Sequence, residues 1–578
     1  MTSVHPMNIL DSRRLTGPGL LLDGPGAVLD IQLEEAERDP AVSAWTKAAS
    51  RLLQAVGWEN ERLISRTFPG GVSLAVAAPL DGLYAATELN ERAWAAATAE
   101  LEGRRAPDFR ADVASLLNEM ANERNPDLVA ISLAARARGV TFLSGEDLVS
   151  VGTGSGAVVW PADALPELGE IDWTGVHDIP TVLVTGSNGK TTVVRLLGAM
   201  VAAAGRVPGI TSTDGVTVGP TLLEGGDFSG PSGARMVLRR REVETAILET
   251  ARGGILRRGL PVERADVAVV TNVSDDHLGE FGVVSLPDLA TTKLLVARPL
   301  GSTGTLVLNA DDPLLAERGH SIAARINWFT LDPSSELVAR HLKRGGTAVV
   351  ADGGRIVLAQ GERRATLLEI AEIPITFAGS ARHNVANVLA AVAAAAALGI
   401  GVPEMTAALR RFGQQLEDNP GRANLIELGG VRVLLDFAHN PHGMAALVSV
   451  AKTIPAQRRL LLVGQAGDRS DDAIRELARA AWTLRPDHVV VKEMETYLRG
   501  RELGEVPALL ADEFSRLGVP EEAISWAGPE IAGVRRALEW ARPDDLLVLA
   551  VHEDRPAVLD LLDRLAAMKW RAGEPIPG

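Results

Sequence analysis

The 578-residue sequence contains no cysteine. Disulfide bonds, thiolate catalysis and cysteine-ligated zinc are therefore excluded as sources of stability or chemistry. Any bound metal must be held by oxygen atoms or by the imidazole of the ten histidines. The absence of cysteine thus narrows the metal chemistry that the chain can support.

Aromatic residues and long apolar runs are also scarce. Phenylalanine, tryptophan and tyrosine make up 4% of the chain, so the core must be packed mainly by alanine, leucine and valine. The longest apolar run, residues 388–402, is rich in alanine and too short to cross a bilayer, and a buried helix explains it better. The first ten residues lack a basic stretch followed by an apolar core. We therefore expect no signal peptide, no membrane partner and a cytoplasmic protein.

Basic residues are outnumbered by acidic ones. Lysine and arginine number 58 against 74 aspartates and glutamates, which gives a formal net charge of −16. Nucleic acids bind basic surfaces, so we expect no nucleic-acid partner. A hydrophobic content of 46% with 23% charged residues is typical of globular proteins. The length favours about three or four domains.

One stretch organises the chain. Apolar residues 182–184 lead into a glycine-bearing turn and then into a helix-like segment, which predicts a strand, a phosphate-binding loop and a helix N-terminus. Glycines let the backbone approach an anion, a lysine can reach the outer phosphates of ATP, and a hydroxyl can bind Mg²⁺. The predicted nucleotide-binding residues of this loop are Thr185, Gly186, Ser187, Asn188, Gly189, Lys190, Thr191 and Thr192.

The loop departs from the commonest P-loop, because Val184 stands where the first glycine of that pattern is expected. An ordinary glycine-rich turn with a solvated lysine is the alternative interpretation. The shorter form found here, Thr-Gly-Ser-Asn-Gly-Lys-Thr-Thr, resembles the loop of Mur-type amide ligases. A second glycine-rich segment, residues 152–156, is followed by no lysine and no strong helix, so we predict a hairpin or loop there.

Alternating strand and helix patterns divide the chain into three predicted units. Residues 1–170 indicate a smaller α+β domain, residues 171–418 an α/β domain with a mostly parallel sheet, and residues 419–578 a Rossmann-like α/β domain. The strands expected in the second and third units are 181–185, 245–248, 267–271, 305–308, 431–437, 459–463, 488–491 and 546–550. The fold class is therefore α/β.

Three further segments of the middle unit have characteristic patterns. We predict helices at residues 291–299 and 385–398. Residues 331–375 alternate apolar and polar positions between Gly-Gly turns, which predicts a meander of antiparallel strands.

Candidate magnesium ligands follow the predicted strands. Glu249 ends one apolar strand, and Asp275, Asp276 and His277 follow the next, while Lys293 lies on the helix after that. Open α/β sheets bind ligands at this carboxyl edge. Each residue alone is as easily explained as a helix cap, a surface ion pair or a structural histidine. Their order after the phosphate loop favours a metal and nucleotide site.

Three strings make a family resemblance specific. Residues 209–215, 226–238 and 248–260 together resemble the Mur-ligase half of cyanophycin synthetases, and the string Glu-Thr-Ala-Arg-Gly-Gly-Ile-Leu-Arg (249–257) is the most diagnostic of them. The resemblance runs from about residue 181 to the C-terminus. Residues 7–18 are more faintly similar to the opening of the N-terminal domain of that family.

The resemblance implies roles at the nucleotide. Asn309 resembles the Mur element beside the adenine, Arg422 the hinge arginine that reaches the phosphates, and Asp436 the residue that meets the ribose. Thr191 and Glu249 are implied as ligands of one Mg²⁺. A second Mg²⁺ is implied at His277 with Lys293 in a carbamylated form. The implied catalytic residues are Lys190, Glu249, His277, Lys293 and Arg422.

The resemblance also implies substrate-binding residues within the same signatures. These are Asp214, Arg235, Arg252, His439 and Arg499. Phe437 stands where the family carries tyrosine. For residues 492–501, contact with the incoming amino acid and a basic surface loop are both open.

The implied activity is an ATP-dependent carboxylate–amine ligase that acts through an acyl phosphate. Cyanophycin synthetases carry an ATP-grasp module between their N-terminal and Mur-like parts, whereas here residue 170 leads almost directly into the phosphate loop. We therefore expect one ligation, such as addition of arginine to a carboxylate of an aspartyl peptide or polymer. A ligase of the folate-polyglutamate type, or a nucleotide-binding subunit acting only with a separate ATP-grasp partner, are the alternatives. A homo-oligomer is also open.

Overall fold

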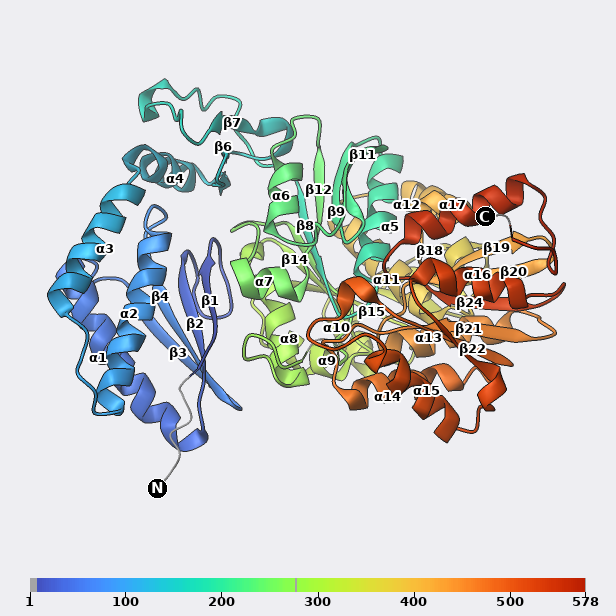
Figure 1. Cartoon of the computed structure of the whole chain (residues 1–578). Helices are drawn as coiled ribbons and strands as arrows, with labels where there is room; N and C mark the ends of the chain where they lie inside the picture. Colours follow the sequence, from blue (N-terminus) through green and yellow to red (C-terminus); the bar gives the residue numbers. More distant parts are fainter. Residues whose placement is uncertain (1–7, 276–277, 577–578) are drawn as a thin grey trace.

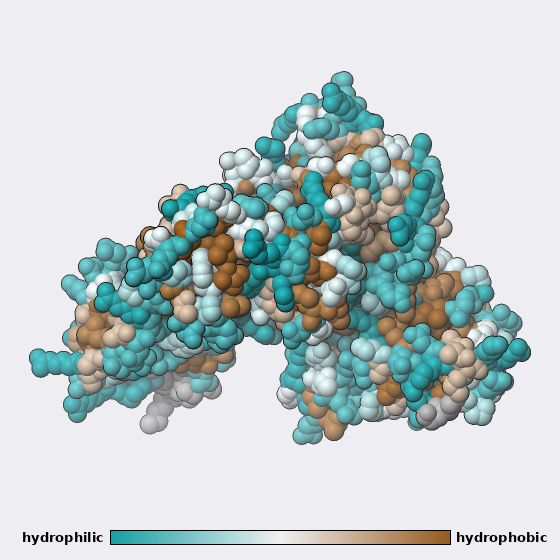
Figure 2. Space-filling model, turned by 90° about the horizontal axis from the view of Figure 1, so that it is seen from above, coloured by the Kyte–Doolittle hydropathy of each residue, from teal (hydrophilic) through white to brown (hydrophobic). Residues whose placement is uncertain are grey.

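The computed structural model describes residues 8–275 and 278–576. In Figure 1 the N-terminal unit lies at the left, the largest sheet in the centre and the last sheet at the right. Figure 2 shows hydrophilic residues over most of the upper face, with apolar residues in separate patches between them. In the described ranges, no helix is both long and apolar enough to cross a membrane. We use the predicted boundaries near residues 170 and 418 to name an N-terminal, a middle and a C-terminal unit.

The N-terminal unit packs helices on one antiparallel sheet with the strand order β1-β2-β4-β3. Its core includes Trp45 and Trp94, and the Trp45 indole donates to the amide oxygen of Asn90 at 2.9 Å. The glycine-rich residues 152–156 connect β6 to β7, which confirms the predicted hairpin. The elements are β1 (Ile9–Leu15), β2 (Gly26–Gln32), α1 (Glu35–Val56), β3 (Leu63–Phe68), β4 (Gly71–Ala77), α2 (Leu83–Leu101), α3 (Phe109–Glu123), α4 (Pro126–Arg138), β5 (Phe142–Leu143), β6 (Leu148–Val151), η1 (Gly154–Gly156), β7 (Val158–Pro161) and η2 (Leu168–Glu170).

The middle unit is built on an eleven-stranded sheet in the order β11-β10-β9-β12-β8-β13-β14-β15-β16-β17-β18. The strands from β9 to β16 pair in parallel, and antiparallel strands extend both edges. The strands are β8 (Thr181–Thr185), β9 (Pro208–Ser212), β10 (Gly215–Val218), β11 (Thr221–Gly225), β12 (Thr245–Glu249), β13 (Val267–Val270), β14 (Thr305–Asn309), β15 (Arg325–Thr330), β16 (Thr347–Asp352), β17 (Arg355–Gln360) and β18 (Arg363–Glu369). The four strands predicted here from apolar runs are confirmed as β8, β12, β13 and β14.

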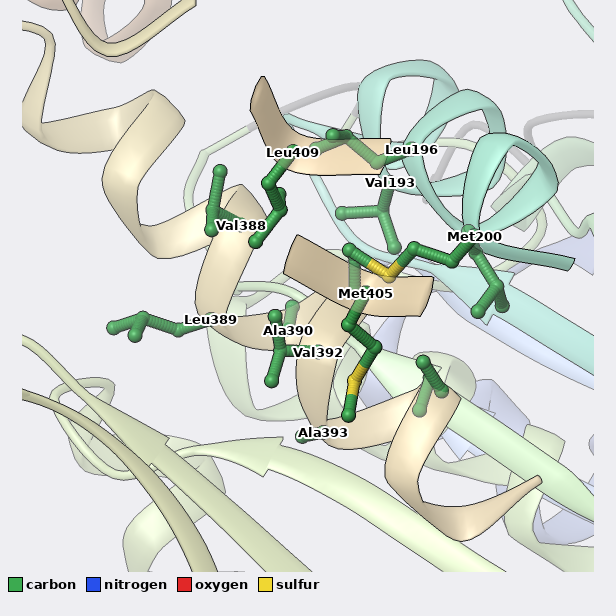
Figure 3. Packing of buried hydrophobic residues seen from close by; sticks show 14 of the residues in the cluster. Val193, Leu196, Met200, Val388, Leu389, Ala390, Val392, Ala393, Met405 and Leu409 are labelled. Atoms are coloured by element: carbon green, nitrogen blue, oxygen red, sulfur yellow. The ribbon is translucent and has the colours of Figure 1, made fainter. Parts of the chain in front are cut away.

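Helices cover both faces of this sheet, because side chains alternate along each strand. Val182 and Val184 of β8 belong to one core with α5, α11 and α12, whereas Leu183 belongs to the core on the opposite face. Figure 3 shows how Val193, Met200 and Met405 meet the alanine-rich α11 in the first core. The helices are α5 (Lys190–Ala203), α6 (Pro231–Leu238), α7 (Arg252–Arg258), α8 (Leu286–Leu294), η3 (Leu295–Leu300), α9 (Pro313–Gly319), α10 (Glu336–Lys343), η4 (Ile370–Glu372), η5 (Pro374–Thr376), α11 (Arg382–Ala397), α12 (Val402–Arg411) and η6 (Leu416–Asp418).

Two predictions for the middle unit were wrong in part. Residues 331–375 form an antiparallel meander only from β16 onward, since α10 occupies their first part. The Ser335 hydroxyl caps that helix, and Val338 and Leu342, four residues apart, bury its inner face. The helix predicted at 291–299 begins earlier, at Leu286, where Ser285 caps α8, and it continues as η3.

The C-terminal unit has a six-stranded sheet in the order β19-β20-β24-β21-β22-β23, parallel except for the β19–β20 hairpin. Helices α13, α14 and α15 cover one face, and α16 and α17 cover the other. The elements are β19 (Asn424–Leu428), β20 (Val431–Asp436), α13 (Pro441–Thr453), β21 (Arg459–Val463), α14 (Asp471–Trp482), β22 (His488–Lys492), η7 (Glu495–Tyr497), α15 (Glu505–Arg516), η8 (Glu521–Ala523), β23 (Ile524–Ala527), α16 (Glu530–Trp540), β24 (Leu546–Ala550) and α17 (Arg555–Ala567).

Candidate nucleotide and magnesium site

The loop between β8 and α5 has the geometry of an anion cradle. Gly186 and Gly189 have positive φ angles of 151° and 84°. A Cβ on Gly186 would lie 1.8 Å from the Thr271 hydroxyl, and one on Gly189 would lie 2.1 Å from the Asn387 amide oxygen. Only glycine fits both positions. The helix begins at Lys190, so the positive end of its dipole faces the loop.

The residues after β13 hold this loop in place. The Ser187 amide donates to the Asn272 carbonyl at 3.0 Å, and the Asn188 amide donates to the Asn272 side-chain oxygen at 3.0 Å. The Ser187 hydroxyl donates to the Ser274 carbonyl at 2.8 Å, while Thr271 donates to the Asn188 carbonyl at 2.6 Å. The sequence analysis did not predict that Asn272 and Ser274 position the loop.

A carboxylate and a hydroxyl meet at the end of the loop. Thr191 donates its hydroxyl hydrogen to Glu249 Oε2 at 2.9 Å. Glu249 is 2% exposed, and its Oε1 has no hydrogen-bond partner in the described ranges. Burial raises the pKa of Glu249, opposed by the positive charges of Lys190 and Arg422. A buried carboxylate oxygen without a donor, beside a hydroxyl, fits Mg²⁺, which prefers oxygen ligands.

The other predicted metal ligands are less fully defined. His277 and Asp276 lie outside the described residues. Lys293 is on α8 and is only 2% exposed. Among residues 8–275 and 278–576, no group of three histidines, aspartates or glutamates could hold a metal. Thr191, Glu249 and Lys293 are thus the predicted metal-site residues that lie within the described ranges.

The hinge arginine reaches this site from the C-terminal unit. Arg422 donates to the Thr213 hydroxyl at 3.3 Å and approaches the Thr191 hydroxyl at 3.5 Å, while its guanidinium lies 4.4 Å from the centre of the Phe437 ring. Its buried Nε has no acceptor in the part of the chain that the structure describes. The neighbouring Asn419 donates to the Thr192 hydroxyl at 3.2 Å. The hinge and the phosphate loop are therefore in contact.

Asp436 lies close enough to Arg422 for their charges to interact. Its Oδ2 accepts from the Ala423 amide at 2.7 Å. Burial raises the pKa of Asp436 to about 6, although Arg422 lowers it. His439 follows on the same loop, and its Nδ1 lies 3.1 Å from the Phe437 carbonyl oxygen.

Asn309 occupies the end of β14, two strands from the phosphate loop. Its amide donates to the Thr271 carbonyl at 3.0 Å, and its side-chain oxygen accepts from the Asp311 amide at 2.9 Å. Thr271 is also the residue whose hydroxyl packs against Gly186, so it connects Asn309 to the phosphate loop. Asn309 therefore lies along the same carboxyl edge as the loop.

Asp214, which stays a predicted substrate residue, pairs with arginines of two units. Its Oδ2 pairs with Arg195 of α5 at 3.0 Å, and its Oδ1 pairs with Arg555 of α17 at 2.5 Å. These arginines and Arg422 hold the pKa of Asp214 below its usual value, against the effect of burial. Neither Arg195 nor Arg555 was predicted, because 341 positions separate Asp214 from Arg555 and no motif marks the pair.

The remaining predicted substrate residues lie on different elements. Arg235 of α6 donates to the Thr16 hydroxyl of the N-terminal unit at 3.0 Å. Arg252, at the start of α7, pairs with Glu280. Arg499 pairs with Asp468 at 2.5 Å in the C-terminal unit and lies over the Tyr497 ring. Arg235 and Arg252 thus lie toward the N-terminal unit and Arg499 away from it.

Comparisons with known proteins agree with this geometry. Residues 184–395 match the Mur ligase middle domain, and residues 421–550 match the Mur ligase, glutamate ligase domain. A UDP-N-acetylmuramoylalanine–D-glutamate ligase of Pelotomaculum thermopropionicum is 31% identical over 70% of this chain and 78% of its own. The chain belongs to the Mur ligase family. Members of this family are ATP-dependent acid–amino acid ligases.

A cyanophycin synthetase of Trichormus variabilis is 38% identical over 64% of this Mur ligase chain. The chain spans only 41% of the length of that relative. Among solved structures, Escherichia coli FolC in complex with ADP has a TM-score of 0.50 at 18% identity, covering 67% of this chain and 90% of its own. The structural likeness supports the fold.

Proposed function

We propose that this Mur ligase family member joins a carboxylate to the amine of an amino acid at the expense of ATP. The observation that carries the proposal is the buried Thr191–Glu249 pair, with its free Oε1, at the end of a glycine cradle. ATP supplies a γ-phosphoryl group that turns the acceptor carboxylate into an acyl phosphate, which the amine attacks to give amide, ADP and phosphate. Each protein group in the site has a task that suits this chemistry.

The loop residues 185–192 bind the phosphates through backbone amides, and Lys190 neutralises charge on the outer ones. Thr191 and Glu249 hold Mg²⁺. For a second Mg²⁺ we propose His277 together with Lys293. The Lys293 ammonium would first lose its proton, and the neutral amine would then add CO₂ and release a second proton to give a carbamate, because Mg²⁺ prefers oxygen ligands to an amine.

The C-terminal unit completes the nucleotide site. Arg422 adds a positive charge at the phosphates, where charge develops during transfer. We assign the ribose to Asp436 and the adenine edge to Asn309. The contacts of Arg422 with Thr191 and of Asn419 with Thr192 support closure of the two units over ATP.

For the acceptor we propose a peptide or polymer of acidic residues, and for the amine an amino acid such as arginine. The supporting observation is the 38% identity to a cyanophycin synthetase. Substrate contacts are proposed for Asp214, Arg235, Arg252, His439 and Arg499. Asp214 contributes by fixing Arg195 and Arg555 at the edge of the site.

The test is release of ADP from ATP by the purified protein with a panel of acidic acceptors and amino acids, including aspartyl peptides with arginine. We expect turnover that needs both substrates, and Lys190→Ala should abolish it. The exposed Lys343→Ala on α10 is the matched control and should leave turnover unchanged. Absence of ADP with every pair would contradict the proposal. Turnover only after addition of an ATP-grasp protein would favour a subunit of a larger assembly.

A further inference from the structure

The Asn188 side chain of the phosphate loop is held by the C-terminal unit. Its Oδ1 accepts from the Nδ2 of Asn440 at 3.0 Å, and its Nδ2 lies 3.3 Å from the Nδ1 of His442. The same Nδ2 donates to the Ser274 hydroxyl at 3.2 Å. Asn440 and His442 lie at the start of α13, 252 and 254 positions from Asn188. One side-chain amide thus joins the loop to the C-terminal unit.

A backbone amide fixes the direction of each of these hydrogen bonds. The Gly443 amide can only donate, and it lies 2.8 Å from the side chain of Asn440, so the atom that it meets is Oδ1. The other end of the Asn440 amide is then the NH₂ group, and the atom of Asn188 that faces it is oxygen. The remaining atom of Asn188 is therefore a donor, and the Nδ1 of His442 accepts from it.

This network requires the neutral form of His442. Nδ1 carries no proton when it accepts, so the single ring proton lies on Nε2. Protonation of the ring would place an N–H group opposite the NH₂ group of Asn188. Rotating the Asn188 amide by half a turn would not relieve this repulsion, because its NH₂ group would then face the NH₂ group of Asn440, which Gly443 keeps in place. A proton on His442 therefore removes this contact between the units.

Two titratable groups act on His442 from other elements. Asp312 is the N-cap of α9, and its carboxylate accepts from the Val273 amide at 2.6 Å and from the Leu314 amide at 3.0 Å. His383 lies on α11, and burial together with His442 lowers its pKa to about 4. Desolvation lowers the pKa of His442 below the usual 6.5, although Asp312 raises it. The neutral form of His442 is therefore the favoured one near pH 7.

The position of the phosphate loop depends on both units. The Asn188 carbonyl accepts from the Thr271 hydroxyl at 2.6 Å and from the Asn272 side chain at 3.1 Å, so the middle unit holds the backbone of Asn188. The C-terminal unit holds its side chain. Asn188 precedes Lys190, the first residue of α5, by two positions. A change in the seating of the C-terminal unit therefore reaches the residues that face the phosphates.

We propose that His442 is a positioning residue that, in its neutral form, seats the C-terminal unit on the phosphate loop through Asn188. This inference rests on the proposed nucleotide site and adds to it a contact that one proton controls. The contact is present above the usual pKa of a histidine and is lost as the pH falls through the lower pKa of His442. Acid therefore loosens the loop and weakens its hold on ATP.

The test is amide hydrogen exchange of the loop peptide 186–190 in the full-length protein without ATP, which reports how often the loop opens. Leucine and asparagine have nearly the same size, but only asparagine keeps an acceptor near the position of Nδ1. At pH 8 we expect exchange to be about 5-fold faster in His442→Leu, because one hydrogen bond is lost, and unchanged in His442→Asn. His442 is exposed, so neither substitution disturbs a core.

The matched control is His320→Leu, which replaces the exposed histidine at the end of α9 and should leave exchange of the loop unchanged. Equal exchange in His442→Leu and the wild type would overturn the proposal. Faster exchange in His442→Asn as well would also overturn it, because the imidazole ring and not its acceptor would then matter. In the Asn188→Ala background, His442→Leu should have no further effect, and an undiminished effect would show that His442 does not act through Asn188.

Lowering the pH gives an independent readout. The ratio of the exchange rates of the wild type and His442→Asn should rise by up to about 5-fold between pH 8 and pH 5, because only the wild type loses its acceptor. The ratio cancels the intrinsic pH dependence of exchange and the titration of Asp436. A constant ratio would overturn the proposal. Failure of the ligase proposal appears instead as absence of ADP release, with the exchange results unaffected.

Discussion

Replacing Asp436 with asparagine should change how the stability of the C-terminal unit depends on pH. Burial raises the pKa of this carboxyl from 3.8 to about 6 in the folded protein. Each pKa unit corresponds to about 1.36 kcal/mol, so the full difference between the protonation states is about 3 kcal/mol. Solvent still reaches part of the residue, which weakens the effect. We therefore expect the contribution of Asp436 to the free energy of unfolding to change by about 2 kcal/mol between pH 4.5 and 7.5.

The sign follows from the order in which the two states lose the proton. Below pH 3.8 the carboxyl is protonated in both the folded and the unfolded protein. Above that value the unfolded carboxyl ionises first, while the folded one keeps its proton to about pH 6. The stability present at low pH is therefore lost as the pH rises through about 6. Asparagine has no proton to lose, so the variant lacks this dependence.

The measurement is scanning calorimetry of the wild type and Asp436→Asn from pH 4.5 to 7.5. The melting temperature of the wild type, minus that of the variant, should fall by about 4–8 °C in the transition of the C-terminal unit as the pH rises. Subtraction removes the contribution of other titrating groups. A constant difference, or one that increases with pH, would refute the reasoning, because the latter would mean that Arg422 outweighs burial.

His383 provides a matched case of opposite sign. Burial and the nearby His442 lower the pKa of His383 to about 4. Its neutral form is favoured in the folded protein, so its contribution to stability is present above 6.5 and lost as the pH falls through about 4. The difference between wild type and His383→Gln should therefore increase with pH over the interval in which the Asp436 difference decreases.

Other substitutions test separate parts of the site. Gly186→Ala should weaken ATP binding at least about 10-fold in calorimetric titration, because the new Cβ would lie 1.8 Å from the Thr271 hydroxyl, and wild-type affinity would contradict this. Asp214→Asn and Arg555→Gln should couple by about 1–3 kcal/mol in a double-mutant cycle on ATP affinity, and additive effects would argue against their ion pair as a link between units. Glu249→Gln should raise the Mg²⁺ concentration needed for ADP release by about 10- to 100-fold, whereas an unchanged requirement would remove Glu249 from the metal site.

The sequence predicted the parts of the fold that rest on local pattern. The central strands are short apolar runs buried on both faces, and β8 ends where Gly186 interrupts the run. The wrong assignment of α10 had a local cause, since Val338 and Leu342 repeat at a helical spacing of four within a segment rich in alternation. Ser335, a good N-cap residue, was the sequence signal for the start of this helix, and the alternating pattern made it easy to overlook.

The site was predicted less evenly, because some of its contacts depend on the packing of distant segments. Thr191 and Glu249 lie on elements with clear signals, and their hydrogen bond follows from adjacent parallel strands. The Asp214–Arg555 pair depends on how the C-terminal unit sits on the middle unit, which no local pattern encodes. The roles assigned to individual residues stay predictions.

The most diagnostic string of the sequence has two separate physical tasks. Its first residue, Glu249, ends a buried strand and lies in the proposed metal site. Gly254 of the string, and Gly259 just after it, serve packing: a Cβ on Gly254 would come within 3.1 Å of the Gly230 backbone, and one on Gly259 within 2.2 Å of the Gly17 carbonyl. The same short segment thus connects the proposed metal site to the N-terminal unit.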